Sequence, residues 1–498
     1  MSAPSDQTHS ANLVEEPSPR WSIRGPALFA GPTAAIAVAT TLPEPSATAE
    51  TFALSHEGGV VLGLMAWMAI WWLFQAVPIA VTALLPVALL PVFGVGRFSD
   101  AAAPYASDVI FLFAGGCLLA TAIDRHGLGR RFATAILSVA GRRPAALVGA
   151  FVVVTAALSA VVSNTATVAI VLPLAAGAVA YVERHAAPGP ERDRLVRRFT
   201  VCLLLAVAYA ANIGGCLTIV GSPPNAIGAK LLSERTGEPI SFLGWMRFGA
   251  PVVAIMLPTM WLLLTSVLQP LRDLVLDTDE GPTFEAAKPM TREAWFTLGV
   301  FLATVAAWVS RPYWPGEISS IGDWGVATIA ALLLLCVPLR TSTGCTTLGV
   351  RDLAGLPWGV FILFGGGISL AVAMKAHGVD GYLGSLFTDL EGLPPWLVVA
   401  AVVAAVVFLT EITSNTAVAS AVIPVLLALA ATLAMAPAEL VLTVAVAASL
   451  AFMLPVGTPP NALVFSTGRV PVAAMIRCGL VLNLVAIVVI TGLSRILL

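Results

Sequence analysis

Apolar stretches that are long enough to cross a lipid bilayer recur along almost the whole chain. A helix needs about 20 mostly apolar residues to span the hydrocarbon layer. Charged residues make up only 11% of the chain, against about 25% in soluble domains, so we predict an all-α polytopic membrane protein. The predicted spans lie at about 26–43, 59–76, 78–95, 106–123, 199–232, 246–268, 293–310, 322–338, 356–374, 439–467 and 472–494.

The N-terminal region allows two interpretations. Residues 1–24 are polar and contain Pro and Ser, which predicts a flexible tail. The apolar stretch that follows ends shortly before Ala47-Thr48-Ala49, which fits a signal-peptidase site. Because the polar leader is long for a signal peptide, we expect instead an uncleaved first transmembrane helix, with its connection, in residues 25–54.

Two further apolar stretches, 144–182 and 394–433, are about 40 residues long, and each carries Ser-Asn-Thr near its middle. Each is either two spans or one re-entrant hairpin. Basic residues flank both ends of the first stretch, and almost none flank the second, so the positive-inside rule places the first pair of ends in the cytoplasm and the second pair outside. The flanking basic residues are Arg125, Arg130, Arg131, Arg142 and Arg143 before the first stretch, and Arg184, Arg192, Arg194, Arg197 and Arg198 after it.

With one hairpin entering from each face, the chain has about eleven transmembrane helices and two re-entrant helical hairpins. The N-terminus then lies in the cytoplasm and the C-terminus outside the inner membrane. Counting each long stretch as two spans leaves the same sidedness, so the basic residues do not by themselves establish re-entrance.

An internal repeat supports the hairpins. Short motifs recur in the same order in both halves, which predicts an inverted structural repeat with a site at its interface. We place the repeats at residues 55–268 and 293–498, joined by a cytoplasmic linker at 269–292. The matches at an offset of 251 residues are Leu112–Gly116 with Leu363–Gly367, His126-Gly127 with His377-Gly378, Ser163–Ala166 with Ser414–Ala417, and Pro173 with Pro424; Gly221–Ala226 matches Gly457–Ala462 at an offset of 236.

The repeated motifs predict interruptions in the helices at mid-membrane. Pro-Pro removes two amide donors and disfavours helix before it, so each Pro-Pro-Asn marks a broken helix, in 199–232 and in 439–467. Each Ser-Asn-Thr marks a hairpin tip. The exposed helix N-termini favour anions, the freed carbonyls favour hard cations, and an Asn side chain serves both.

The distribution of charge points to cation coupling. Residues 144–183, 199–229 and 394–467 contain no Lys or Arg, so a bound dicarboxylate would meet no fixed positive side chain. An uncompensated anion in a low-dielectric site is very unfavourable, and bound sodium ions would neutralise it. Glu411 is the acidic residue within the second hairpin. Its role stays open between a hydrogen-bonded support and a group that attracts cations.

The paired Ser-Asn-Thr motifs and the Gly-Ser-Pro-Pro-Asn and Gly-Thr-Pro-Pro-Asn breaks resemble those of divalent anion/sodium symporters, a family of dicarboxylate, citrate and sulfate carriers. The resemblance extends from about residue 55 to the C-terminus. It implies a homodimer, an elevator mechanism with a scaffold and a moving transport domain, and at least two sodium ions flanking the substrate. The family also contains sodium-independent exchangers. Because the chain keeps hydroxyl groups at the sodium positions, we expect a sodium symporter of C4-type dicarboxylates such as succinate, malate or fumarate.

The resemblance also implies individual site residues. The match at Gly457 is looser, because some relatives carry another small residue there. The positions that resemble the first sodium site are Ser159, Ser163, Asn164 and Gly221, and those that resemble the second are Thr410, Ser414, Asn415 and Gly457. The positions that resemble the substrate shell are Asn164, Thr165, Ser222, Asn415, Thr416, Thr458 and Pro459.

Other functions are less consistent with the sequence. A sulfate or tricarboxylate carrier and a dicarboxylate exchanger are the nearest alternatives, followed by an arsenite or proton-antiport relative and by a channel. An enzyme is not expected, because Ser163 and Ser414 have no His in their motif segments. The six Cys show no metal-ligand spacing, and a net charge of −2 does not suggest a nucleic-acid partner. We therefore expect no organic cofactor.

Overall fold

The computed structural model describes residues 21–41, 54–138, 141, 143–278, 282, 289–315, 318, 321–339, 346–387 and 392–498. Within these residues the fold is all-α, with no strand beyond one isolated bridge between Ala186 and Leu276. The predicted tail up to residue 20, most of the connection after the first helix, and much of the linker at 269–292 lie outside the described residues.

The described residues of the first half form twelve α-helices, with a 3-10 turn at Ala103–Ala106 and a π-helical turn at Leu264–Leu268 that extends the last of them. They are α1 (Trp21–Thr41), α2 (His56–Phe74), α3 (Ile79–Thr82), α4 (Leu85–Val92), α5 (Phe98–Ala102), α6 (Asp108–Arg125), α7 (Leu128–Leu137), α8 (Pro144–Ser159), α9 (Asn164–His185), α10 (Arg192–Gly215), α11 (Pro223–Thr236) and α12 (Phe242–Leu263).

The second half repeats this order from α16 onward: a long helix, a short one, a hairpin, a broken helix and a long final helix. The helices are α13 (Arg292–Ser310), α14 (Asp323–Cys336), α15 (Val350–Ala354), α16 (Trp358–Ala376), α17 (Val379–Ser385), α18 (Pro395–Thr410), α19 (Asn415–Thr432), α20 (Pro437–Ala447), α21 (Pro459–Ser466) and α22 (Val472–Leu497).

Nine helices in the described part of the chain are long and apolar enough to cross a membrane, so the polytopic all-α class is confirmed. The count of eleven spans stays a prediction. One predicted span is wrong in form: residues 78–95 are not one helix but α3 and α4. Pro86 lies in the first turn of α4; it lacks an amide donor and disfavours helix before it, so the chain turns and restarts there.

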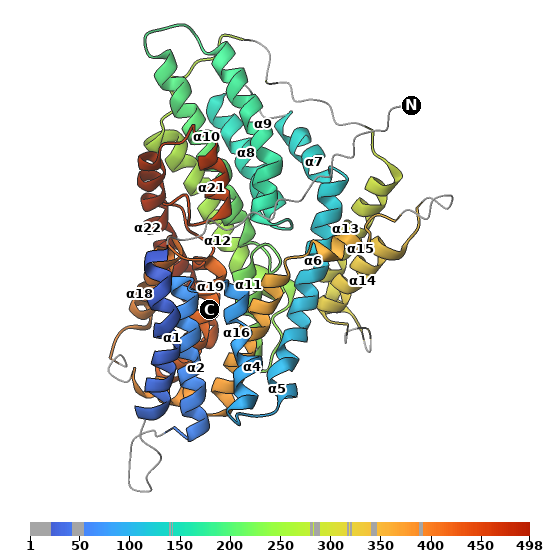
Figure 1. Cartoon of the computed structure of the whole chain (residues 1–498). Coiled ribbons are helices and arrows are strands. Elements are labelled where there is room, and N and C mark those ends of the chain that lie inside the picture. The colour runs from blue at the N-terminus through green and yellow to red at the C-terminus, as the bar shows by residue number, and fades with distance from the viewer. Residues whose placement is uncertain are drawn as a thin grey trace, which may run out of the picture.

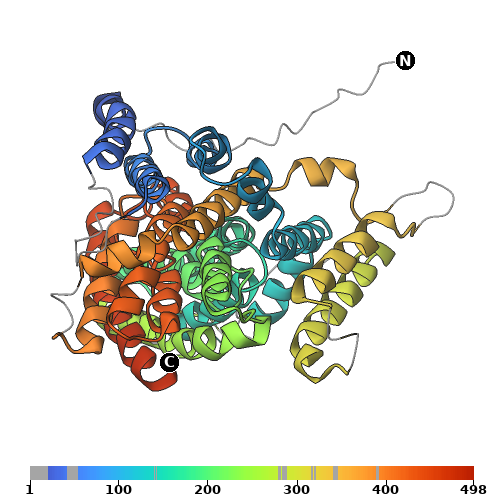
Figure 2. The same ribbon diagram turned by 90° about the horizontal axis from the view of Figure 1, so that it is seen from below.

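The two hairpins occupy opposite halves of the molecule. In Figure 1, α8 and α9 lie in the upper half, and α18 and α19 lie in the lower half. Figure 2 shows α13 and α14 (yellow) at one edge of the bundle and α1 and α2 (dark blue) at another. The centre is occupied by α10, which is buried over most of its length. Its run from Phe199 to Gly215 is buried on all faces, as expected for a helix that is apolar all round.

Candidate functional site

The two Ser-Asn-Thr motifs form the tips of the hairpins. In the first hairpin α8 ends at Ser159 and α9 begins at Asn164; in the second, α18 ends at Thr410 and α19 begins at Asn415. Ser163 caps α9, because its Oγ accepts a hydrogen bond from the Ala166 amide at 3.3 Å. Each tip therefore presents the N-terminus of a new helix at a half-buried position, where free amide donors favour negative charge.

The Pro-Pro-Asn motifs interrupt the other two helices as predicted, and their Asn side chains hold the breaks open. The Asn225 amide donates to the carbonyls of Gly215 and Thr218, both at 2.8 Å. In the second repeat the Asn461 amide donates to the carbonyls of Ala451, at 3.2 Å, and Leu454, at 3.1 Å. The acceptors lie ten and seven residues before the Asn in both cases. Each Asn thus replaces amide donors that the unwound backbone has lost.

The repeats meet crosswise at the breaks. Helix α9 of the first hairpin packs against α21 of the second repeat, and α19 of the second hairpin packs against α11 of the first repeat. Two buried polar contacts join the breaks directly. The Ser222 hydroxyl lies 2.8 Å from the Ser449 hydroxyl, and Asn212 in α10 donates to Thr458 Oγ1 at 3.1 Å. Four helix N-termini, those of α9, α11, α19 and α21, consequently converge from both halves of the chain.

Three of the four residues predicted for the first sodium site, Ser159, Asn164 and Gly221, lie around Gly215, whereas Ser163 is exposed and caps α9. Ser159 Oγ lies 2.6 Å from Asn164 Oδ1 and 2.8 Å from the Ala211 carbonyl. A Cβ atom at Gly215 would lie 2.5 Å from Asn164 Oδ1, and one at Gly221 would lie 2.5 Å from the Gly215 carbonyl. Gly215 therefore lets the hairpin tip approach the broken helix more closely than a side chain would allow, and Gly221 lets the two sides of the break itself lie close together.

The second predicted site leaves an oxygen unpaired. Among the described residues, Asn415 Oδ1 is buried without a hydrogen-bond partner, and so are the side-chain oxygens of Asn212, Asn225, Asn461 and Asn483. Of these five, Asn415 is the one predicted as a cation ligand, and an unpaired buried oxygen is costly unless a ligand or water completes it. Thr410 donates its hydroxyl hydrogen to the Val407 carbonyl at 3.0 Å, which leaves the hydroxyl oxygen free to accept or coordinate. Oxygen donors of this kind suit a hard cation. No group of three or more His, Cys, Asp or Glu that could hold a metal occurs in the described residues.

The residues predicted for the substrate shell differ in accessibility. Asn164, Thr165, Asn415 and Thr416 are half-buried at the tips, and Pro459 is exposed. Ser222 and Thr458 are each 3% exposed and already hydrogen-bonded to Ser449 and Asn212, so a substrate would have to reach them through the breaks. A cavity of about 490 Å³ lies away from these residues, between α11, α16, α17 and α19.

Sequence reasoning missed the residues that assemble the site. Asn225 and Asn461 are part of the repeated motif, and both directly follow Pro-Pro. This shared position could have indicated that they stabilise the breaks. Asn212 and Ser449 gave only a weak signal, as single polar residues within long apolar runs. A polar side chain buried at membrane depth needs a partner, and here that partner comes from the other repeat.

Comparison with known proteins agrees with this architecture. A family profile described as "Sodium:sulfate symporter transmembrane region" matches residues 28–497. The sodium-dependent dicarboxylate transporter SdcS of Staphylococcus saprophyticus subsp. saprophyticus is 36% identical over 453 residues, which cover 88% of this chain and 85% of that protein. SdcS of Staphylococcus aureus strain NCTC 8325 is 35% identical over 448 residues, with the same coverage.

A solved structure shares the fold at low identity. The YdaH transporter of Alcanivorax borkumensis superposes with a TM-score of 0.63 at 15% identity, over 94% of this chain and 96% of that one. The hairpins, the broken helices and the membrane-spanning helices define a multi-pass membrane transporter. With the profile matching nearly the whole chain, the protein belongs to the sodium:sulfate symporter family.

Proposed function

We propose that the protein is a secondary active transporter that couples inward sodium flow to the uptake of C4-type dicarboxylates, such as succinate, malate or fumarate. The names of its relatives support sodium and dicarboxylates as the transported species. The observation from the site that supports cation coupling is the Asn415 carbonyl oxygen, which has no partner among the described residues. It lies at a helix N-terminus, in a segment that lacks Lys and Arg.

In this proposal cations and anion are bound as one set. Ser159, Ser163, Asn164 and Gly221 hold one sodium ion, and Thr410, Ser414, Asn415 and Gly457 hold another. The substrate carboxylates meet the hydroxyls, amides and helix N-termini at Asn164, Thr165, Ser222, Asn415, Thr416, Thr458 and Pro459. Two sodium ions neutralise a dianion, so each species lowers the electrostatic cost of burying the other. A third would make transport electrogenic, worth about 2.3 kcal/mol per charge per 100 mV.

The direct test is uptake of radiolabelled succinate by proteoliposomes of the purified protein. We expect uptake above the equilibrium level when sodium is present outside only, and background uptake when choline or potassium replaces sodium on both sides. Full uptake without sodium would refute the coupling. Preloading the vesicles with dicarboxylate separates symport from exchange, because only an exchanger needs an internal partner.

Sulfate is the second candidate substrate, because the matching profile is described by sodium:sulfate symport. An excess of unlabelled sulfate or citrate in the same assay separates the two. A dicarboxylate carrier is expected to be inhibited by malate and fumarate but little by sulfate, whereas a sulfate carrier shows the reverse order.

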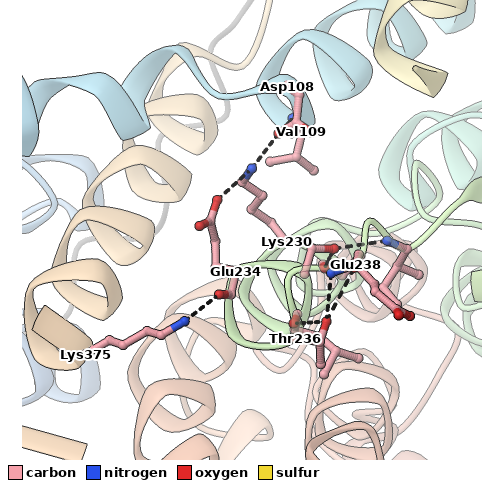
Figure 3. Close-up of polar contacts among 11 residues, drawn as sticks. Asp108, Val109, Lys230, Glu234, Thr236, Glu238 and Lys375 are labelled. Carbon is pink, nitrogen blue, oxygen red and sulfur yellow. Dashed lines mark hydrogen bonds and ion pairs between the residues drawn. The ribbon is translucent and has the colours of Figure 1, made fainter. Parts of the chain in front are cut away.

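We also propose an elevator movement in which the hairpins, the broken helices, α12 and α22 move against a frame formed by the remaining helices. Ion pairs cross the proposed boundary around α11. Lys230 Nζ lies 2.6 Å from Asp108 Oδ1 of α6, and Arg235 lies 2.7 Å from Asp380 of α17. Figure 3 shows Lys230 between Asp108 and Glu234, and Lys375 of α16 donating to the Glu234 carbonyl at 3.1 Å. These contacts must break if α11 moves.

Cross-linking across this boundary is expected to stop transport. In the Arg235→Cys/Asp380→Cys variant a short bis-maleimide should join α11 to α17 and reduce uptake to background, because the moving unit is then tied to the frame. The matched control is Arg125→Cys/Asp352→Cys, which replaces an ion pair between α6 and α15 within the frame. Uptake should survive cross-linking there. Unchanged uptake after complete cross-linking of the first pair would argue against the elevator.

We further propose a homodimer in the cytoplasmic membrane, with the N-terminus inside and the C-terminus outside. The Arg residues that flank the first hairpin support this sidedness. Mass measurement in nanodiscs tests the dimer. Impermeant labelling of a cysteine placed at each terminus of intact cells tests the orientation, and labelling of the N-terminal cysteine from outside would contradict it.

A further inference from the structure

Glu411 is held by four hydrogen-bond donors at the tip of the second hairpin, and it is only 3% exposed. Its Oε1 accepts from the backbone amides of Phe452, at 2.6 Å, and Met453, at 2.8 Å, and its Oε2 accepts from that of Leu454, at 2.9 Å. The Asn483 side chain of α22 donates to Oε1 at 2.8 Å. Both oxygens act as acceptors, as in an ionised carboxylate.

The first repeat builds the same junction without charge. The residue 251 positions before Glu411 is Ala160. Here a neutral hydroxyl joins the tip to the break, because Thr218 Oγ1 donates to the Ala160 carbonyl and accepts from the Gly221 amide at 3.1 Å. The carboxylate is therefore a feature of the second repeat alone.

The donor that supports Glu411 is also missing from the first repeat. Gly249 of α12 packs on the Cys216 carbonyl, and Gly479 of α22 packs on the Phe452 carbonyl, so these glycines are equivalent and lie 230 residues apart. The same offset pairs Asn483 with Val253. The polar pair of the second repeat thus corresponds to two apolar residues in the first.

The carboxylate lies directly against the second break. A Cβ atom at Gly457 would lie 3.0 Å from Glu411 Oε2, so the glycine makes room for the carboxylate. Glu411 also follows Thr410 in the chain, and Thr410 and Gly457 are both among the residues that we assign to the second sodium ion. A carboxylate charge close to a cation site attracts the cation strongly, because the interior screens charge poorly.

We propose that Glu411 is a positioning residue that makes the two cation half-sites unequal. It shapes the break at 452–454 and places a carboxylate beside the half-site of Thr410, Ser414, Asn415 and Gly457. This half-site consequently binds sodium more tightly than the first and fills before it. The inference rests on the proposed sodium coupling.

Sodium binding is measured without transport, by thermal unfolding of the purified protein while sodium replaces choline at constant ionic strength. Glu411→Gln should raise the sodium concentration at which stabilisation sets in by about tenfold or more, because the charge is lost and stabilisation begins near the dissociation constant. The double variant Glu411→Gln/Asn483→Asp restores one negative charge and gives the Gln amide an acceptor. It should therefore reverse most of the shift in sodium concentration. Thr218→Val is the matched control: it loosens the neutral junction of the first repeat and should lower the melting temperature without this shift.

The outcomes separate the inference from the function on which it rests. A folded Glu411→Gln protein that is stabilised from the same sodium concentration upward as the wild type overturns the role of Glu411 while sodium coupling stands. Equal shifts in Glu411→Gln and Thr218→Val overturn the role of Glu411 as well, because a purely structural role of both junctions would then explain both shifts. Absence of any stabilisation of the wild type by sodium overturns the coupling itself, and this inference with it.

A second measurement keeps Glu411 in place, in case Glu411→Gln does not fold. Ile412→Cys and Val161→Cys put thiols at equivalent positions of the two tips, 251 residues apart, in a Cys336→Ser/Cys345→Ser background. Sodium should slow maleimide labelling at position 412 at a lower concentration than at position 161. Equal protection midpoints at the two tips, or the reverse order, overturn the inference.

Discussion

Replacing Asn415 by alanine is expected to reduce sodium-driven succinate uptake by about 100-fold or more, because each lost hydrogen bond or ligand contact to a charged group costs about 1.5–3 kcal/mol. The Asn415 carbonyl oxygen is buried without a partner among the described residues, and its amide lies at the N-terminus of α19. A single side chain therefore faces both the proposed cation and the proposed anion. Alanine removes both contacts at once.

The same loss is expected for Asn164→Ala in the first repeat, whose carbonyl oxygen is already within hydrogen-bond distance of Ser159. Uptake is measured in proteoliposomes at equal protein density, with gel filtration to verify folding. Thr259→Ala is the control, because this exposed hydroxyl on α12 bonds to the Ile255 carbonyl of its own helix. Near-wild-type rates in folded Asn164→Ala and Asn415→Ala proteins would refute the assignment of the site.

The second large effect is expected from Gly215→Ala. The added methyl group would lie 2.5 Å from Asn164 Oδ1 and 3.1 Å from Asn164 Nδ2, so the side chain must leave its position next to Ser159. Overpacking of this kind costs about 1–3 kcal/mol, which corresponds to a loss of uptake of about 5–150-fold if the cost falls on binding. Stability should suffer less, because alanine is a better helix former than glycine by about 1 kcal/mol.

Gly177→Ala provides the matched control for this substitution. Gly177 lies in α9, and within the described residues no heavy atom beyond its own stretch of helix comes within 4 Å of an added Cβ. The same chemical change should therefore leave uptake unaltered. Radiolabelled uptake and a sodium titration on both variants decide the matter. Equal uptake by the two alanine variants would contradict the prediction, because it would show that transport does not depend on the position of Asn164 next to Gly215.

Much of the architecture could be predicted because it is encoded locally. Long apolar runs must bury their backbone polar groups in helices, and Pro-Pro must interrupt them. The hairpins at 144–182 and 394–433 and the breaks at Pro223 and Pro459 accordingly lie where expected. Where the local rule was misjudged, as for residues 78–95, the cause was again local: Pro86 restarts the helix.

The role of Glu411 shows where local reasoning ends. Its sequence surroundings left a support and a cation-attracting group equally open. The structure adds three amides from residues 452–454 and Asn483 of α22, which lies 72 residues further along the chain. No local pattern indicates that these donors meet at one carboxylate.

The sequence by itself determined the membrane class, the two hairpins, the two broken helices and the kinds of side chain at their tips, because hydrophobic runs, prolines and repeated motifs act on the backbone next to them. Only the tertiary structure decided which oxygens and amides face one another. The contact of Asn212 with Thr458 joins residues 246 positions apart, and that of Ser222 with Ser449 joins residues 227 apart. Such pairs depend on how the two repeats pack crosswise, and packing is a property of the whole bundle rather than of any segment.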